Sequence, residues 1–203
     1  MTQPPTSVFV GVTGASGAPY AVRVVAALAA AGCRLSVCLS DTGLAVVRHE
    51  LSFDVSSRTD VTAAFLAAAD GSEAQVFRPD DLEAPLASGS NFPDAAVICP
   101  CSMSTLAAIA LGAGRNLIHR AGDVALKEGR PLVLVPREVP LSEIHLTRML
   151  EARRAGAVIV PPMPGFYGRP QTLDDVIDFV AGKVVAALGL EQRLYAPWTG
   201  PDA

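Results

Sequence analysis

Short apolar runs alternate with helical stretches along almost the whole chain, and this alternation is the feature that most constrains the fold. Runs this short and this free of polar residues are typical of parallel strands buried on both faces. The order predicts one α/β domain: a doubly wound parallel sheet between two helical layers, three layers in all. We expect strands at 8–13, 34–40, 94–99, 131–135 and 157–160, and helices at 18–31, 41–51, 61–69, 102–111, 117–128, 141–155 and 172–188.

Composition excludes several other classes of protein. Half of the 203 residues are apolar and 18% are charged, whereas a disordered chain is polar and rich in charge. No apolar stretch reaches the roughly 20 uninterrupted residues of a membrane helix. The net charge is −4 and there is no basic stripe, so neither a membrane nor a nucleic acid is an expected partner. Aromatic residues are scarce, and the large apolar fraction suggests an interface between subunits.

Cysteine, histidine and the two termini carry weaker signals. Cys33, Cys38, Cys99 and Cys101 lack the spacing of a metal site, and we expect reduced, mostly buried thiols. The histidines are scattered, so no metal is expected. The first residues have no basic region followed by an apolar core, which favours a cytoplasmic protein. We expect disorder over 1–7, the domain over 8–190, and a tail over 191–203 that can act as a lid over the active site.

Ligands of doubly wound sheets bind at the carboxyl ends of the strands. The first such loop, GASG at 14–17, offers small residues, free amides and the hydroxyls of Thr13 and Ser16 at a helix start. It matches neither the dinucleotide fingerprint nor the P-loop, yet it suits a phosphate or a cofactor edge. A tight turn that needs glycine only for packing is the alternative. The loop Ser102, Met103, Ser104 and Thr105 follows another strand, with more hydroxyls than one helix cap requires.

Charged and aromatic residues near other strand ends are further candidates. Arg137 and Glu138 directly follow a buried strand: arginine can hold phosphate oxygens, and glutamate can act as an acid or base. Because Tyr and Trp are rare here, we assign Tyr167 and Trp198 to a ligand pocket. The alternatives are a proline-stiffened connection around Tyr167 and surface packing of Tyr195 and Trp198 in the tail. The DDxxD pattern at 174–178 resembles a magnesium–diphosphate motif, but at a helix start we interpret it as capping.

The motifs together resemble the UbiX-type flavin prenyltransferases, relatives of the flavin-dependent cysteine decarboxylases. The similar segments run in order from residue 8 to 190: TGASG (13–17), SGS (88–90), CPCS (99–102), NLI and RA (116–121), LKE (126–128), PRE (136–138) and PGFY (164–167). The resemblance implies a Rossmann-like flavoprotein domain assembled as a dodecamer of trimers. It also implies metal-free transfer of the dimethylallyl group of dimethylallyl monophosphate to N5 and C6 of reduced FMN. A UbiD-type decarboxylase would receive the product, prenylated FMN.

The resemblance also implies roles for individual residues. Implied FMN contacts are Gly14, Ala15, Ser16, Ser40, Ser102, Met103, Ser104, Thr105, Arg120 and Arg137. Implied contacts of the prenyl phosphate are Lys127, Arg137, Tyr167 and Lys183, to which the scarcity of aromatics adds Trp198, in a pocket completed across a subunit boundary. Implied catalytic residues are Ser16, Glu50, Lys127 and Glu138, of which Ser16 and Glu138 handle protons.

Two departures from the family pattern and two rival functions remain at this point. Lys183 stands where many members have Arg, which replaces a two-pronged contact by a point charge. Leu82 lies where some members carry an aromatic residue. A flavin-dependent cysteine decarboxylase would need a histidine near the glycine-rich loops, and none is evident in the sequence. A non-catalytic FMN carrier would tolerate loss of Lys127 or Glu138.

Overall fold

A six-stranded sheet with the order β3-β2-β1-β4-β5-β6 forms the centre of the computed structural model, which describes residues 4–71 and 73–200. Every neighbouring pair is parallel. The strands are β1 (Ser7–Val12), β2 (Arg34–Leu39), β3 (Gln75–Phe77), β4 (Ala95–Cys101), β5 (Leu132–Pro136) and β6 (Val158–Ile159). The chain runs outward from β1 through β2 to β3 and then returns to β4 on the other side of β1. The carboxyl ends of β1 and β4 are therefore the switch point at which such folds bind ligands.

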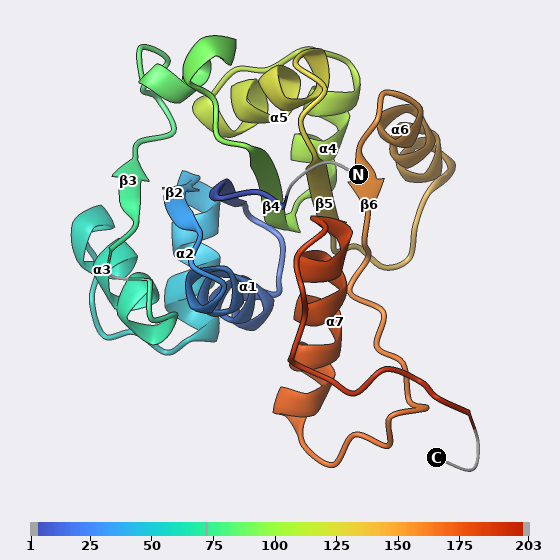
Figure 1. Cartoon of the computed structure of the whole chain (residues 1–203). Coiled ribbons are helices and arrows are strands. Elements are labelled where there is room, and N and C mark those ends of the chain that lie inside the picture. The colour runs from blue at the N-terminus through green and yellow to red at the C-terminus, as the bar shows by residue number, and fades with distance from the viewer. Residues whose placement is uncertain (1–3, 72, 201–203) are drawn as a thin grey trace.

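Helices cover both faces of this sheet (Figure 1). They are α1 (Ala18–Ala30), α2 (Asp41–Glu50), α3 (Arg58–Ala68), α4 (Met103–Ala110), α5 (Leu117–Lys127), α6 (Glu143–Arg154) and α7 (Leu173–Ala187), with single 3-10 turns at Pro85–Ala87 and Gly89–Asn91. The three-layer, Rossmann-like single domain expected from the sequence is confirmed.

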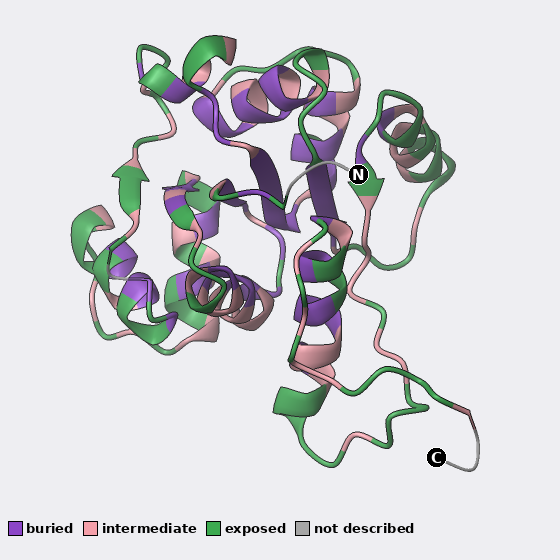
Figure 2. Ribbon diagram, in the orientation of Figure 1, coloured by how far each residue is buried: buried purple, intermediate pink, exposed green. Residues whose placement is uncertain are grey.

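The two apolar cores follow from the alternation of side chains along each strand. Val8, Val10 and Val12 of β1 join one core with α1 and α7, whereas Phe9 joins the other with α4 and α5. β4 is buried along its whole length. Figure 2 shows the buried strands between helices whose outer faces are exposed. A strand buried on both faces needs no polar positions, which explains why these strands stand out in the sequence.

The elements differ from expectation mainly at edges. The sequence did not predict β3, because this strand has three residues, of which Gln75 and Val76 are exposed. The expected disorder of 1–7 does not describe residues 4–7. Ser7 begins β1, Pro5 is buried, and both Thr6 and Ser7 donate hydrogen bonds to the Asp94 carboxylate. Residues 1–3 and 201–203 lie outside the described part of the chain.

We call residues 161–200 the arm. The segment after β6, the first turns of α7 and the tail extend away from the sheet (Figures 1 and 2), whereas the second half of α7 packs in the core. The tail is docked on α7 at Gly182, where a Cβ atom would lie 2.6 Å from Cε1 of Tyr195. Gln192 supports this turn, because its side chain accepts the amide of Leu194 at 3.0 Å and donates to the carbonyl of Tyr195 at 2.9 Å. The tail therefore has a defined position against α7.

All four cysteines are free thiols, as expected. Cys38, Cys99 and Cys101 are buried, and burial raises the pKa of the Cys38 thiol to about 12. A neutral thiol of this kind is a weak nucleophile and packs as a small apolar side chain. Among the described residues, no helix has the length and apolar character needed to cross a membrane.

Candidate active site

The loops after β1 and β4 are joined by the buried hydroxyl of Thr13. This hydroxyl donates to the carbonyl of Pro100 at 2.8 Å and accepts the amide of Ser102 at 2.7 Å. The backbone amide of Thr13 donates to the same carbonyl at 3.2 Å. The hydroxyl therefore ties two candidate ligand loops together. Its expected availability to a ligand was wrong, since both of its hydrogen-bonding functions are used within the protein.

Ser16 lies between Glu50, the last residue of α2, and Arg137, which follows β5. Arg137 Nε donates to the carbonyl of Ser16 at 3.2 Å. One oxygen of Glu50 accepts the amides of Gly17 and Ala18 at 2.9 and 2.8 Å. The structure thus brings together Ser16, Glu50 and Arg137, three candidate residues that are far apart in the sequence. No side chain of its own caps α1, and the Glu50 carboxylate takes that role.

The surroundings of Glu50 keep its carboxylate ionised. Burial alone would raise its pKa. Hydrogen bonds from the Ser16 hydroxyl and from the amides of Gly17 and Ala18, together with the charge of Arg137, lower the pKa below its usual value. A carboxylate in this state neutralises the positive end of α1 and orders the Ser16 loop.

The Glu50→Gln variant is expected to be less stable at neutral pH by about 1 kcal/mol, the usual effect of a helix cap, because the carboxylate is partly exposed to solvent. A lowered folded-state pKa stabilises the protein above the unfolded pKa of about 4.3, and that contribution disappears as the pH falls through the folded pKa. Thermal unfolding at pH 7 and in acid measures the difference. Equal destabilisation at both pH values would contradict this role of the charge.

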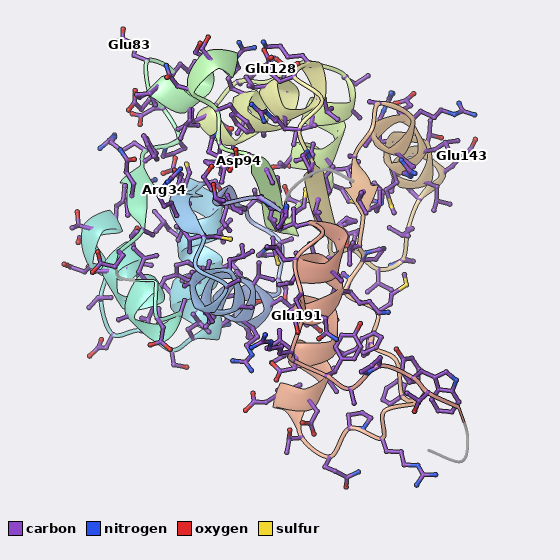
Figure 3. The ribbon with its side chains drawn as sticks, in the orientation of Figure 1. Arg34, Glu83, Asp94, Glu128, Glu143 and Glu191 are labelled. Atoms are coloured by element: carbon purple, nitrogen blue, oxygen red, sulfur yellow. The ribbon has the colours of Figure 1, made fainter. Side chains whose placement is uncertain are left out.

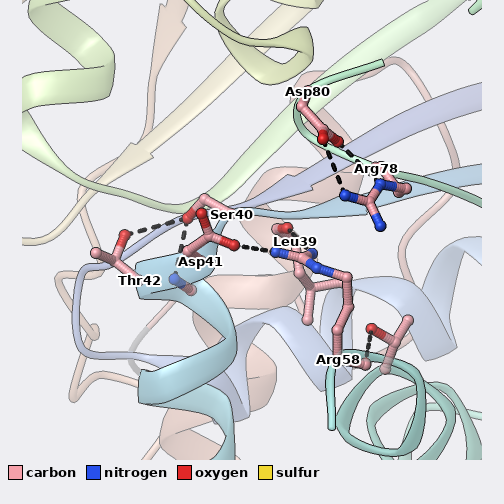
Figure 4. Close-up of polar contacts among 9 residues, drawn as sticks. Leu39, Ser40, Asp41, Thr42, Arg58, Arg78 and Asp80 are labelled. Atoms are coloured by element: carbon pink, nitrogen blue, oxygen red, sulfur yellow. Dashed lines mark hydrogen bonds and ion pairs between the residues drawn. The ribbon is translucent and has the colours of Figure 1, made fainter.

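The first turn of α2, directly after β2, lies against the loop after β1. A Cβ atom on Gly14 would lie 2.5 Å from Oγ1 of Thr42, so only glycine permits this approach. The Ser40 hydroxyl caps α2 by accepting the amide of Gly43 at 3.0 Å, and it lies 3.2 Å from the Thr42 hydroxyl. Figure 4 shows the adjoining ion pairs, in which Arg58 binds Asp41 and the carbonyl of Leu39 while Arg78 binds Asp80.

The start of α4 combines a helix cap with free donors. The Ser102 hydroxyl accepts the amide of Thr105 at 3.3 Å and lies 3.0 Å from the hydroxyl of Ser104. Capping therefore accounts for Ser102, while Ser104 is exposed and Thr105 is buried. In the described part of the chain, the amides of Met103 and Ser104 have no hydrogen-bond partner. The same holds for the amides of Gly14, Ala15 and Ser16.

The free donors of the two loops can be compared with the acceptor atoms of an anionic flavin mononucleotide. Two neighbouring loops present unpaired amides and hydroxyls, and α4 directs the positive end of its dipole toward one of them. Arg137 adds a cation beside the Ser16 loop. A phosphate group and the acceptor atoms of a flavin ring would satisfy this donor set, so the residues fit the group.

The arm gathers the aromatic candidates. The ring centroid of Tyr167 lies 5.6 Å from that of Phe179 and 5.7 Å from that of Trp198, both with edge-to-face geometry. The rings of Phe179 and Tyr195 are 4.9 Å apart. The ammonium of Lys183 lies over both of these rings. Tyr167, Lys183 and Trp198, which the sequence assigned to one pocket, therefore do belong to one cluster.

Lys127 and Arg120 are not brought to Ser16 within one chain. Lys127 is the last residue of α5 and forms an ion pair with Glu128, near the beginning of β5, whereas Arg137 follows the end of β5. Figure 3 shows Glu128 beside α5, well separated from Glu191 beside α7. Arg120 donates to the carbonyl of Ala87 at 3.0 Å and pairs with Asp123 on its own helix.

Glu138 is exposed, and one of its carboxylate oxygens accepts the amide of Val139 at 3.0 Å. Its side chain makes no other hydrogen bond or ion pair within residues 4–71 and 73–200. No hydrogen bond or ion pair of the described residues joins Lys127, the Ser16 loop and the aromatic cluster. One chain thus presents three separate groups of candidate residues.

The acidic pattern at 174–178 is a capping arrangement, as expected. The Thr172 hydroxyl accepts the amide of Asp175, and the Asp175 carboxylate accepts the amide of Thr172. Asp178 instead pairs with Arg23 of α1. Within the described ranges, no group of His, Cys, Asp and Glu has the arrangement of a metal site.

Sequence reasoning missed three residues that shape the candidate site. Thr42 meets Gly14, Phe179 and Tyr195 surround Lys183, and none of these contacts leaves a signal in the spacing of motifs. Phe179 lies within an amphipathic helix, where an aromatic residue usually packs in the core. Tyr195 was expected either to act as a lid together with Trp198 or to pack on the surface, and its contact with Lys183 was not foreseen.

The chain is similar in sequence and in fold to known flavoproteins. The model of the Flavoprotein family matches residues 2–185. The flavin prenyltransferase UbiX of Halalkalibacterium halodurans is 47% identical over 189 residues, which cover 93% of this chain and 91% of that protein. The crystal structure of AnUbiX (PadA1) in complex with FMN and dimethylallyl pyrophosphate superposes with a TM-score of 0.86 at 40% identity, covering 97% of this chain and 98% of the other.

A second solved structure is a dodecameric FMN-dependent UbiX-like decarboxylase from Escherichia coli O157:H7. It superposes with a TM-score of 0.83 at 41% identity and covers 96% of this chain and 100% of the other. Cysteine decarboxylases such as TvaF, at 19% identity and a TM-score of 0.55, share only the fold.

Proposed function

The chain belongs to the UbiX-type flavin prenyltransferases of the Flavoprotein family, and on this premise we propose that it joins the dimethylallyl group of dimethylallyl monophosphate to N5 and C6 of reduced FMN. The transfer breaks the bond between the prenyl carbon and the phosphate oxygen and forms two bonds, to N5 and to C6 of the flavin. Each of these positions gives up a proton: one proton is taken up by the prenyl double bond as the ring closes, and the other leaves with the released phosphate. Similarity to prenyltransferases over almost the full length of both chains is the observation that carries this proposal.

The flavin is the acceptor substrate, and its nucleophilic N5 and C6 positions supply the chemistry that takes up the prenyl group. Its contacts are proposed from the free amides at the two loops. Met103 and Ser104 with the dipole of α4 suit the phosphate, and Gly14, Ala15 and Ser16 suit the ring edge. Arg137 orders the Ser16 loop and adds positive charge. Ser40 lies at the start of α2 and Thr105 in the first turn of α4, next to these two loops.

The prenyl phosphate is proposed to lie between cations and aromatic rings. Lys127 and Lys183 would stabilise the charge that develops on the leaving phosphate. The faces of Tyr167 and Trp198 would stabilise positive charge on the allyl group. The AnUbiX structure holds dimethylallyl pyrophosphate, so the number of phosphates that this chain accepts is an outcome of the experiment below.

Proton handling is proposed to divide between Glu138 and Ser16, with Glu50 in support. Glu138 is exposed, and one of its carboxylate oxygens has no partner among the described residues, as a base that removes the flavin C6 proton requires. Glu50 instead is engaged by two backbone amides and is kept ionised. We propose that Glu50 acts by holding Ser16 rather than by exchanging protons itself.

A complete site is proposed to form only between subunits, because the three groups share no hydrogen bond or ion pair in the described part of one chain. Many large apolar side chains are exposed on α6 and around the arm, as expected for surfaces that other subunits cover. They are Val139, Ile144, Leu146, Leu150, Met163, Phe166, Leu173 and Trp198. A dodecamer, as in the Escherichia coli structure, is the proposed assembly. A UbiD-type decarboxylase is the proposed recipient of the product.

The rival functions predict different chemistry. A cysteine decarboxylase would place a histidine base at the flavin. None of the three histidines makes a hydrogen bond to the loop at residues 14–17, and His145 instead caps α6. An FMN carrier would bind flavin but leave its mass unchanged.

The experiment that tests the function is anaerobic incubation of the protein with reduced FMN and dimethylallyl monophosphate, with the diphosphate in a parallel reaction. Mass spectrometry is expected to find flavin heavier by five carbons and eight hydrogens. A reaction without protein is the control. Recovery of unmodified FMN alone from both donors would overturn the proposed function.

A further inference from the structure

Aromatic residues are concentrated around one cation of the arm. Tyr and Trp together number four in this chain, and three of them, Tyr167, Tyr195 and Trp198, lie in the same cluster. Aromatic residues make up only 5% of the sequence. The buried aromatic residues of the two cores, Phe9, Phe65 and Phe92, are phenylalanines, whereas this cluster outside the cores holds rings that carry polar groups.

Lys183 occupies the centre of this cluster. Its ammonium lies 5.3 Å from the ring centroid of Phe179 and 5.5 Å from that of Tyr195, both within the range of cation–π attraction. A hydrogen bond with the Tyr195 hydroxyl raises the pKa of Lys183, and the nearby Tyr167 adds to that rise. The side chain of Lys183 is exposed, and its ammonium rests against these two rings rather than against an acidic partner in the described part of the chain.

A glycine next to Lys183 on α7 leaves room for this arrangement. Gly182 lets the Tyr195 ring lie against the helix, since a Cβ atom there would lie 2.6 Å from Cε1 of that ring. Gln192 fixes the backbone on either side of Tyr195. The tail therefore places the Tyr195 ring beside the Lys183 ammonium.

We infer that Phe179 and Tyr195 are positioning residues that hold the ammonium of Lys183 ready for the phosphate of the prenyl donor; this inference rests on the proposed function. Lysine is a point charge on a flexible stem, whereas arginine presents a rigid fork. The rings of Phe179 and Tyr195 restrict the Lys183 side chain before the donor binds, so less conformational entropy is lost on binding. The tail thus belongs to the donor site through Tyr195.

Steady-state kinetics test the inference with variants of the full chain. The Tyr195→Leu variant is expected to raise KM for dimethylallyl phosphate roughly tenfold, with FMN affinity unchanged. Tyr195→Phe keeps the ring and should have a smaller effect. Arg193→Ala is the matched control, because Arg193 lies on the same tail and pairs only with Glu191 in the described part of the chain. A donor KM equal to that of the wild type in Tyr195→Leu would overturn the inference.

Gly182→Ala separates positioning from stability. The added methyl group would displace the Tyr195 ring, while alanine favours the helix more than glycine does. We expect a donor KM raised as in Tyr195→Leu, without a lower melting temperature. A wild type that makes no prenylated flavin would refute the proposed function, whereas an active wild type beside unaffected variants would refute only this inference.

Acylation of lysines gives a readout that does not depend on activity. The chain has two lysines, Lys127 and Lys183, so Lys127 serves as an internal reference in the same sample. Held near the two rings as an ammonium, Lys183 is expected to react more slowly than Lys127 with acetic anhydride. Its relative rate, measured by mass spectrometry of peptides, should rise in Tyr195→Leu but not in Arg193→Ala. An unchanged rate ratio in Tyr195→Leu would overturn the inference.

Discussion

The Lys127→Ala variant is expected to lose prenyl transfer by about 100-fold or more while it still binds FMN. Loss of a cation that stabilises developing charge typically lowers a rate by this much. Lys127 ends α5 with an exposed side chain paired to Glu128, and among the described residues it makes no hydrogen bond or ion pair with the flavin loops. Its loss should therefore spare both the fold and FMN binding. Single-turnover formation of prenylated flavin and flavin fluorescence measure the two effects.

Arg130→Ala is the matched control for Lys127. Arg130 is also an exposed cation, three residues further along the chain and outside the proposed site. A general loss of positive charge at this end of α5 would affect both variants equally. If Lys127→Ala transferred the prenyl group at the wild-type rate, Lys127 would have no part in the reaction, as the FMN-carrier hypothesis requires.

The Glu138→Gln variant is expected to slow the reaction by roughly 100-fold to 10,000-fold, the usual range for loss of a general base. The change removes the negative charge but keeps an oxygen that can accept the amide of Val139, so the local backbone should be preserved. Both FMN and the donor should still bind. Rapid-mixing kinetics under anaerobic conditions can show whether donor binding persists while product formation fails.

Glu143→Gln provides the control for Glu138→Gln, since Glu143 is another exposed carboxylate in the first turn of the next helix. We expect this control to react like the wild type. Full activity of Glu138→Gln would assign the proton step to another group, and Ser16 would be the first to examine.

Much of the fold was predictable, because strands buried on both faces leave an unmistakable apolar pattern. β1, β4 and β5 came within one or two residues of their expected bounds. β3 did not, since a three-residue edge strand with exposed side chains resembles a loop. Helix ends marked by capping residues, such as Ser102 before α4 and Thr172 before α7, were equally readable.

The candidate site was predictable only in part, because sequence identifies residues but not their neighbours. The motif residues Ser16, Glu50 and Arg137 do meet. The buried hydroxyl of Thr13 binds the protein rather than a ligand, which no local pattern could indicate. The contact of Tyr195 with Lys183 depends on the turn of the tail at Gln192. Lys127 stays a predicted contact, and its place at the end of α5, paired with Glu128, emerges only from the packing of that helix.

The central claim is a flavin prenyltransferase site built from different subunits, and hybrid oligomers test it most directly. Lys127→Ala and Glu138→Gln chains, each with its own affinity tag, would be co-expressed, and mixed oligomers isolated by both tags. If the two residues of each site come from different subunits, about a quarter of the sites in an equal mixture regain both native residues. We expect prenylated flavin from the hybrids at about that fraction of the wild-type rate. Hybrids as inactive as their two parents would contradict a site built from different subunits.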